Sequence, residues 1–254
     1  MKGPEVKKTQ IELHEKLSDD YVQRYEPEFS KLYQRHRNND LLKGLPTNPT
    51  LKVLDCGCGT GVLFERLKKR YHAPVGIDLS MSMLEKVNKK DEDGFICADA
   101  ETLPFSNDSF DIAISRGVLH HVPNPHGAIT QIHKSLKKGG YFLVSEPCND
   151  FWLVRFIREK MYKKSKSFDD NEHPFISIEL ASLMKIEGFK ILKTRFFGYF
   201  AYMLAGFPDI LPVLKYVPFN VYIVKALIFL DEVISRIPVL KRFGLHVVIL
   251  GVKE

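Results

Sequence analysis

The chain contains the stretch Val53-Leu54-Asp55-Cys56-Gly57-Cys58-Gly59-Thr60-Gly61, in which a short apolar run leads into three alternate glycines. This pattern predicts a strand that ends in a tight turn and opens directly into a helix. Glycine at alternate positions lets the backbone turn sharply and lets a ligand lie against it with no Cβ in the way. A glycine triplet also occurs as a plain strand-to-helix turn, so the ligand interpretation needs support from other residues.

Two further acids stand at the ends of the next two predicted strands. Asp78 ends the strand predicted around 74–79, and Asp99 follows the strand predicted at 94–98. The carboxyl ends of parallel strands meet at one edge of a sheet, and a carboxylate at the end of the second strand can accept both hydroxyls of a ribose. Together with Asp55, these acids favour a nucleoside-containing ligand over a bare turn.

Outward from this stretch, short apolar runs alternate with amphipathic segments. The alternation predicts an α/β fold with a mostly parallel sheet and helices on both faces. The predicted strands are 52–56, 74–79, 94–98, 111–115, 141–145, 190–197 and 246–252, and the predicted helices are 62–71, 82–89, 127–136, 150–164 and 178–187. Ser177 is the expected N-cap of the last helix and Gly188 its stop.

Several motifs taken together resemble the class I S-adenosylmethionine (SAM)-dependent methyltransferases. The segment 55–61 resembles their E/DxGxGxG motif, and 97–105 resembles their adenine-side segment. The segments 109–115, 119–122 and 136–140 resemble later signatures of the small-molecule branch, which includes ubiquinone and menaquinone C-methyltransferases. The resemblance covers about 51–147. It implies a Rossmann-like seven-stranded sheet, SAM as cofactor, a small-molecule acceptor and no metal.

The resemblance also implies how SAM lies. The glycines pass beneath its methionine end, Asp78 holds the ribose, and Asp99 accepts from the adenine amino group. Leu79 and Met83 either pack on the adenine or belong to the ordinary core. The full set of expected SAM-binding residues is Asp55, Gly57, Cys58, Gly59, Gly61, Asp78, Leu79, Met83, Asp99, Ala100 and Ser115. A dehydrogenase of the NAD type fits poorly, because its G-x-G-x-x-G fingerprint needs glycine where Val62 stands.

The expected catalytic residues, His120 and His121, follow the fourth predicted strand. Methyl transfer is an in-line displacement, so the enzyme aligns a nucleophile and, where needed, removes its proton. A histidine with a pKa near neutrality suits that task. Alternatively, either ring caps or packs against the next helix. Arg116 stands beside them as a candidate or a solvated charge, and Glu146 and His173 are weaker candidates.

The two ends of the chain lie outside the resemblance. The segment 1–48 is expected to form a helical cap broken near Pro27, whose Tyr21, Tyr25 and Tyr33 either close over SAM or pack between helices. The core is expected at 49–197 and 246–254, and 198–245 is an apolar helical insertion between the last two strands. Its apolar face must be buried on the protein's own helices, on a second subunit, or as a substrate lid that also rests on a membrane.

Composition narrows the function classes. The 254 residues are 44% hydrophobic, carry a net charge of +6 and include four cysteines, read as reduced thiols that lack zinc-knuckle spacing. No secretory signal pattern opens the chain, so a cytoplasmic location is expected, with peripheral membrane contact or a homodimer through 198–245 left open. The net charge could favour nucleic acid or an anionic membrane surface, yet the basic residues are scattered among acids, so charge alone decides nothing. Methylation of a base amino group is not expected, because Ser115-Arg116-Gly117-Val118 stands where an Asn-Pro-Pro-Tyr type motif would be needed. The alternatives are an RNA or protein methyltransferase and a non-catalytic SAM-binding regulator.

Overall fold

A seven-stranded sheet organises the chain in the computed structural model, which describes residues 3–87, 94–162, 174–206 and 212–254. Its order is β3-β2-β1-β4-β5-β7-β6, and only β7 runs antiparallel to its neighbours. The strands are β1 (Val53–Cys56), β2 (Val75–Asp78), β3 (Phe95–Cys97), β4 (Phe110–Arg116), β5 (Leu136–Pro147), β6 (Phe189–Phe197) and β7 (His246–Lys253). All seven predicted strands are present, and the predicted fold class is confirmed.

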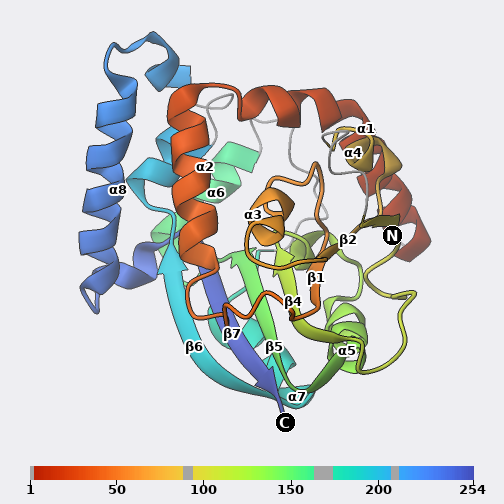
Figure 1. Cartoon of the computed structure of the whole chain (residues 1–254). Coiled ribbons are helices and arrows are strands. Elements are labelled where there is room, and N and C mark those ends of the chain that lie inside the picture. Colours follow the sequence, from red (N-terminus) through yellow and green to blue (C-terminus); the bar gives the residue numbers. More distant parts are fainter. Residues whose placement is uncertain (1–2, 88–93, 163–173, 207–211) are drawn as a thin grey trace.

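Helices cover both faces of this sheet (Figure 1). The described α-helices are α1 (Gly3–Arg24), α2 (Glu28–Leu41), α3 (Phe64–Lys68), α4 (Met81–Leu84), α5 (Pro125–Ser135), α6 (Trp152–Tyr162), α7 (Ser177–Ile186) and α8 (Asn220–Arg236). Two helices are predicted at 82–89 and 150–164, and the last residues of both lie outside the described part of the chain.

Successive side chains of the central strands enter two different cores. Leu54 and Ala113 pack with α5 and α7 on one face, whereas Val53, Ile112 and Ile114 pack with α3 and the end of α2 on the other. Burial on both faces explains why these strands are nearly continuous apolar runs.

Strand register places the predicted site residues level with one another. Cys56 pairs with Ile77 on β2 and with Ser115 on β4, so Gly57, Asp78 and Arg116 follow at the same edge. This carboxyl edge of the parallel strands is the one that α1 crosses in Figure 1.

Two local predictions need correction or extension. Ser177 is not an N-cap, because Ile176 holds that position; the Ser177 amide and hydroxyl both donate to Asp150. The break near Pro27 is confirmed, since α2 begins directly after it, but α1 already begins at Gly3.

The insertion between β6 and β7 packs against α2. It contains a π-helical turn η3 (Tyr202–Gly206), 3-10 turns η4 (Pro212–Tyr216) and η5 (Leu240–Phe243), and α8. Tyr202, Leu214 and Val224 form a third core with Phe29 and Tyr33 of α2. Among the residues that the structure describes, no helix combines the length and apolar character that crossing a membrane requires.

Candidate active site

A cleft lies at the carboxyl edge of the sheet, between the loops that follow β1, β2 and β4 and the helix α1. It encloses about 1100 Å³, open solvent at its mouth included. Eight of the predicted SAM-binding residues line it: Gly57, Cys58, Gly59, Asp78, Leu79, Met83, Asp99 and Ala100. Sites for small molecules and cofactors are commonly concave and lined by apolar side chains with a few polar groups, and the lining of this cleft has that character.

The glycine loop is shaped for close approach by a ligand. Its Gly57 and Cys58 amides donate to Ile77 of β2, which ties the loop to the next strand. Gly57 has φ +77°, and a Cβ there would lie 2.1 Å from a methyl carbon of Val118. Gly59 has φ +54°, and a Cβ there would meet nothing within 4 Å. The open space above Gly59 is therefore available to a ligand, and its backbone favours glycine.

Asp78 joins the glycine loop to the second strand. Its Oδ2 accepts the Gly59 amide at 2.8 Å, and its Oδ1 accepts the Ser80 amide at 2.9 Å. Both carboxylate oxygens are therefore fixed at the cleft wall, where a ribose hydroxyl can reach their remaining lone pairs.

Asp55 lies beneath the loop and is 1% exposed. Among the described residues its Oδ2 has no hydrogen-bond partner. Burial raises the pKa of Asp55 to about 7; the Arg116 charge opposes the shift and Asp78 adds to it. A buried carboxylate without a partner suits a nearby cationic group such as the amino group of SAM.

The remaining predicted SAM-binding residues do not line the cleft. Gly61 faces the core, where a Cβ would contact Phe95 and Val87. Ser115 is fully buried in the sheet, and its Oγ has no partner among the described residues. Their part in SAM binding stays a prediction resting on the loop and strand that carry them.

His120 is held by a buried carboxylate. Its Nδ1 lies 2.7 Å from Oε2 of Glu146, which is fully buried, and the other Glu146 oxygen accepts the Val118 and Leu119 amides at 3.0 Å each. Gly117 lines the cleft, and a Cβ placed on it would lie 3.9 Å from Cε1 of the His120 ring. The carboxylate therefore orients the His120 ring at the border of the cleft.

His121 lines the cleft directly and stacks obliquely on His120, with ring centroids 3.9 Å apart. Its ring also meets His14 of α1 edge-on at 5.6 Å. Burial lowers the pKa of His121 well below its usual value, and the neighbouring His120 and His14 lower it further. His121 is therefore neutral at physiological pH. His173 lies outside the described residues.

The roof of the cleft is α1, whereas the sequence predicted this role only for Tyr21, Tyr25 and Tyr33, of which α1 carries Tyr21 alone. Tyr21 and Tyr25 line the cleft, whereas Tyr33 belongs to the core beneath the insertion. The roof residues that the reasoning missed are Lys7, Gln10, Ile11 and His14. Their spacings of three, one and three, continued by Tyr21, place them on one helical face, and this periodicity was the available signal.

Ion pairs fasten this roof to the adenine side of the cleft. The Lys7 ammonium lies 2.6 Å from Asp99 and also pairs with Glu101. Near the other end of α1, Asp19 pairs with Lys86 at 2.6 Å. The roof thus contacts the carboxylate that is predicted to accept from adenine.

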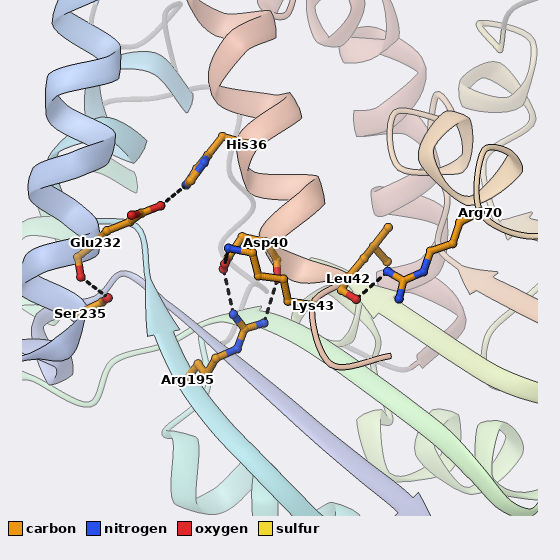
Figure 2. A network of polar contacts seen from close by, with 8 residues as sticks. All are labelled: His36, Asp40, Leu42, Lys43, Arg70, Arg195, Glu232 and Ser235. Carbon is orange, nitrogen blue, oxygen red and sulfur yellow. Dashed lines mark hydrogen bonds and ion pairs between the residues drawn. The ribbon is translucent and has the colours of Figure 1, made fainter. Parts of the chain in front are cut away.

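The insertion contributes to a different pocket. Its residues Ile228, Asp231 and Glu232, with parts of α2 and β6, line a space of about 1080 Å³. Figure 2 shows polar contacts around it, including the ion pair between Asp40 and Arg195 at 2.9 Å. No described residue of 198–245 lines the first cleft, so the described part of the insertion is not its lid.

Within the described residues, no group of histidine, cysteine, aspartate and glutamate side chains could hold a metal ion. The four cysteines are free thiols, and burial raises the pKa values of Cys56, Cys58 and Cys148. Three of the four are therefore protonated and unreactive at neutral pH.

Comparisons with known proteins agree with this site. The family model described as "Methyltransferase domain" matches residues 54–144. An uncharacterized protein of Methanocaldococcus jannaschii is 32% identical over 192 residues, which cover 74% of this chain and 70% of the relative. A 2-methyl-6-phytyl-1,4-hydroquinone methyltransferase of Oryza sativa subsp. japonica is 33% identical over 115 residues, which cover 43% of this chain and 33% of the relative.

The fold has solved counterparts. A SAM-dependent methyltransferase of Thermotoga maritima, described as a possible histamine N-methyltransferase, superposes with a TM-score of 0.68 at 22% identity, over 96% of this chain and 99% of that one. The sheet order, the glycine loop and the matching family model agree with one another. This chain is therefore a class I SAM-dependent methyltransferase and uses SAM as its cofactor.

Proposed function

We propose that the enzyme transfers the methyl group of SAM directly to a small, largely apolar or lipid-like acceptor held beneath α1. The observation that carries this proposal is the set of apolar and aromatic side chains in the cleft lining. Ile11, Tyr21, Tyr25 and Val122 line it, beside His121. An enclosed space with apolar and aromatic walls favours a small molecule, because an RNA or protein acceptor needs an open approach.

The rice relative supports this acceptor class, since its name gives a phytyl-substituted hydroquinone as the molecule that it methylates. It matches only 43% of this chain, and the insertion at 198–245 lies outside the family-model match at 54–144. These similarities support a class of acceptor, and experiment must identify the individual molecule.

We propose His120 as the general base and Glu146 as the residue that positions it. SAM supplies an electrophilic methyl group, and the protein aligns the acceptor and removes its proton. The Glu146 carboxylate accepts from Nδ1–H of His120, so the lone pair is on Nε2, the nitrogen that takes the proton. The carboxylate then stabilises the imidazolium that forms. His121, neutral because it is buried, forms the adjoining wall.

The two alternatives receive less support. A non-catalytic SAM-binding protein has no need of a buried carboxylate that orients a histidine beside the cleft. An RNA methyltransferase is expected to present an open basic surface next to its methyl donor. Here the donor site is instead covered by α1, whose Lys7 is engaged with Asp99 and Glu101.

Methyl-labelled SAM tests the proposal. The enzyme is incubated with the organic-soluble extract, the total RNA and the protein fraction of its native cell, each separately. We expect label in an organic-soluble small molecule, and no transfer by the His120→Ala variant. Label in RNA or protein, or in none of the three fractions, would contradict the proposed acceptor class.

A further inference from the structure

The outer surface of α8 is apolar although nothing in the described chain covers it. Tyr222 and Phe229 are 67% and 69% exposed, and Leu230 and Val233 also face solvent. Positions 222, 226, 229 and 233 share one side of the helix because they are spaced by three or four residues. We call Tyr222, Phe229, Leu230 and Val233 the outer face. The sequence-based expectation that the apolar face of this helix is buried holds only for its opposite side.

The opposite side of α8 is held firmly. Val224 is fully buried in the core shared with α2. Glu232 pairs with His36 of α2 at 3.8 Å, a contact drawn in Figure 2. The carboxylate of Asp231 accepts the Phe200 and Ala201 amides at 3.0 and 3.1 Å. These contacts fix the rotation of α8 about its axis, so the outer face cannot turn inward to be buried.

Exposed apolar side chains also occur in the segments before and after α8 and on α6. Those of η4, η5 and the adjoining turns are Val213, Tyr216, Phe219, Ile237, Val239 and Leu240. On α6, Trp152 is 69% exposed, and its ring lies 5.8 Å from that of Phe151, which packs on Phe243 of η5 at 3.9 Å. The apolar surface therefore extends beyond one helix, and a surface of this kind marks an interaction site.

The charges around this surface have one sign. The exposed basic residues of the described insertion are Lys215, Lys225, Arg236, Lys241 and Arg242. Its two acids, Asp231 and Glu232, are engaged with other parts of the chain, as described above. The Lys225 ammonium lies 5.4 Å from the centre of the Tyr222 ring, so cationic and apolar groups are interleaved on the same side.

From this combination we infer that the outer face docks on the surface of an anionic lipid bilayer. Aromatic and aliphatic side chains enter the interfacial region of a bilayer, and flanking lysines and arginines contact anionic headgroups. A second copy of the chain fits less well, because a two-fold contact through this face brings the basic residues of both copies together. Of the two acids in the described part of the insertion, Asp231 accepts two backbone amides and Glu232 faces His36. The inference goes beyond the proposed function and does not depend on the acceptor.

Vesicle co-sedimentation without SAM or acceptor tests this docking. We expect the wild type to bind vesicles of phosphatidylcholine with phosphatidylglycerol, and to bind phosphatidylcholine alone much more weakly. The Tyr222→Ser/Phe229→Ser variant should lose at least about tenfold in affinity, because two rings no longer bury apolar area. The Lys225→Gln/Arg236→Gln variant should lose on the order of 30-fold on the anionic vesicles.

Matched variants control for exposure and charge. Ile178→Ser/Ile186→Ser removes two side chains of α7 that are 74% and 71% exposed, and Lys8→Gln/Lys31→Gln removes two exposed cations of α1 and α2. Both should bind vesicles as the wild type does. Calorimetry with S-adenosylhomocysteine (SAH) verifies that every variant is folded.

Three outcomes would overturn the inference. The first is a wild type that does not bind anionic vesicles. The second is full binding by the Tyr222→Ser/Phe229→Ser variant. The third is a wild-type dimer that this variant converts to a monomer, since the face would then belong to a second copy. Vesicle binding is measured without SAM or acceptor. A protein that binds vesicles but does not methylate would therefore count against the proposed function and not against this inference.

Discussion

The Nδ1 atom of His120 lies 2.7 Å from a carboxylate oxygen of Glu146, a residue with no exposed surface. The two residues belong to different segments, the turn η2 (Leu119–His121) after β4 and the end of β5. A buried carboxylate is costly unless it is well hydrogen-bonded, and Glu146 meets this requirement with two backbone amides and one imidazole. The arrangement fixes the orientation of the His120 ring, as the proposed role of general base requires.

His120→Ala should lower turnover far more than SAM affinity. A general base contributes roughly 100-fold to 10,000-fold to the rate, whereas the described cleft lining does not include His120. Single-turnover kinetics and SAH calorimetry measure the two effects separately. Wild-type turnover by the variant would make His120 structural. Glu146→Gln provides a second readout, since it should change the pH dependence of turnover while leaving SAH binding intact.

Gly59→Ala should weaken SAH binding, whereas Gly139→Ala should not. Both glycines have positive φ, +54° and +76°, and a Cβ at either position meets nothing within 4 Å. The backbone strain should therefore be similar, about 1 to 2 kcal/mol of stability. Only Gly59 lines the cleft, so only there does the new methyl group compete with the ligand. Equal SAH affinities for the two variants would place the ligand away from the loop.

Asp78→Ala should weaken SAM binding by about 1 to 3 kcal/mol, because hydrogen-bonding groups of the ribose and the Gly59 amide lose their partner. Glu65→Ala, which removes an exposed carboxylate of α3, serves as the control and should bind as the wild type does. Calorimetry of both variants measures the effect. An Asp78→Ala variant with unchanged affinity would remove the ribose role from this residue.

Binding of SAM near neutral pH should release a proton from Asp55. Burial holds its pKa at about 7, and a nearby ammonium group favours the carboxylate and lowers that pKa. Because the folded pKa is raised, Asp55 makes the free protein progressively less stable as pH rises from about 4 to 7. Calorimetry in buffers of different ionisation enthalpy measures the release. Asp55→Asn should abolish it and flatten this part of the stability profile; release unchanged in that variant would assign the proton elsewhere.

Lys7→Met should speed both entry and release of SAH, about 2- to 10-fold, because the roof loses its ion pairs with Asp99 and Glu101. Lys8→Met, next along α1 and well exposed, is the matched control. Stopped-flow measurements of association and dissociation test this. Unchanged rates in Lys7→Met would show that opening of α1 does not limit exchange.

Local patterns were enough to predict most of the architecture and several of the residues that line the cleft. Apolar runs located all seven strands, and the glycine loop with Asp78 and Asp99 indicated the cleft edge, because strand ends and the residues that follow them are adjacent in the chain. The roof of the cleft was less accessible to prediction. The roof contacts of Lys7 and His14 join α1 to loops about a hundred residues away, and no local period reports such a pairing.

By itself, the sequence determined the strand and helix order, the parallel sheet and the position of the glycine loop, since these follow from short-range periodicity and backbone preference. Only the tertiary structure decided that Glu146 orients His120, that α1 rather than the described part of the insertion covers the cleft, and that one side of α8 stays exposed. Each of these depends on which surfaces distant segments present to one another. An apolar stripe shows that burial is favourable, but the packing of the whole chain determines which surface covers it and which remains open.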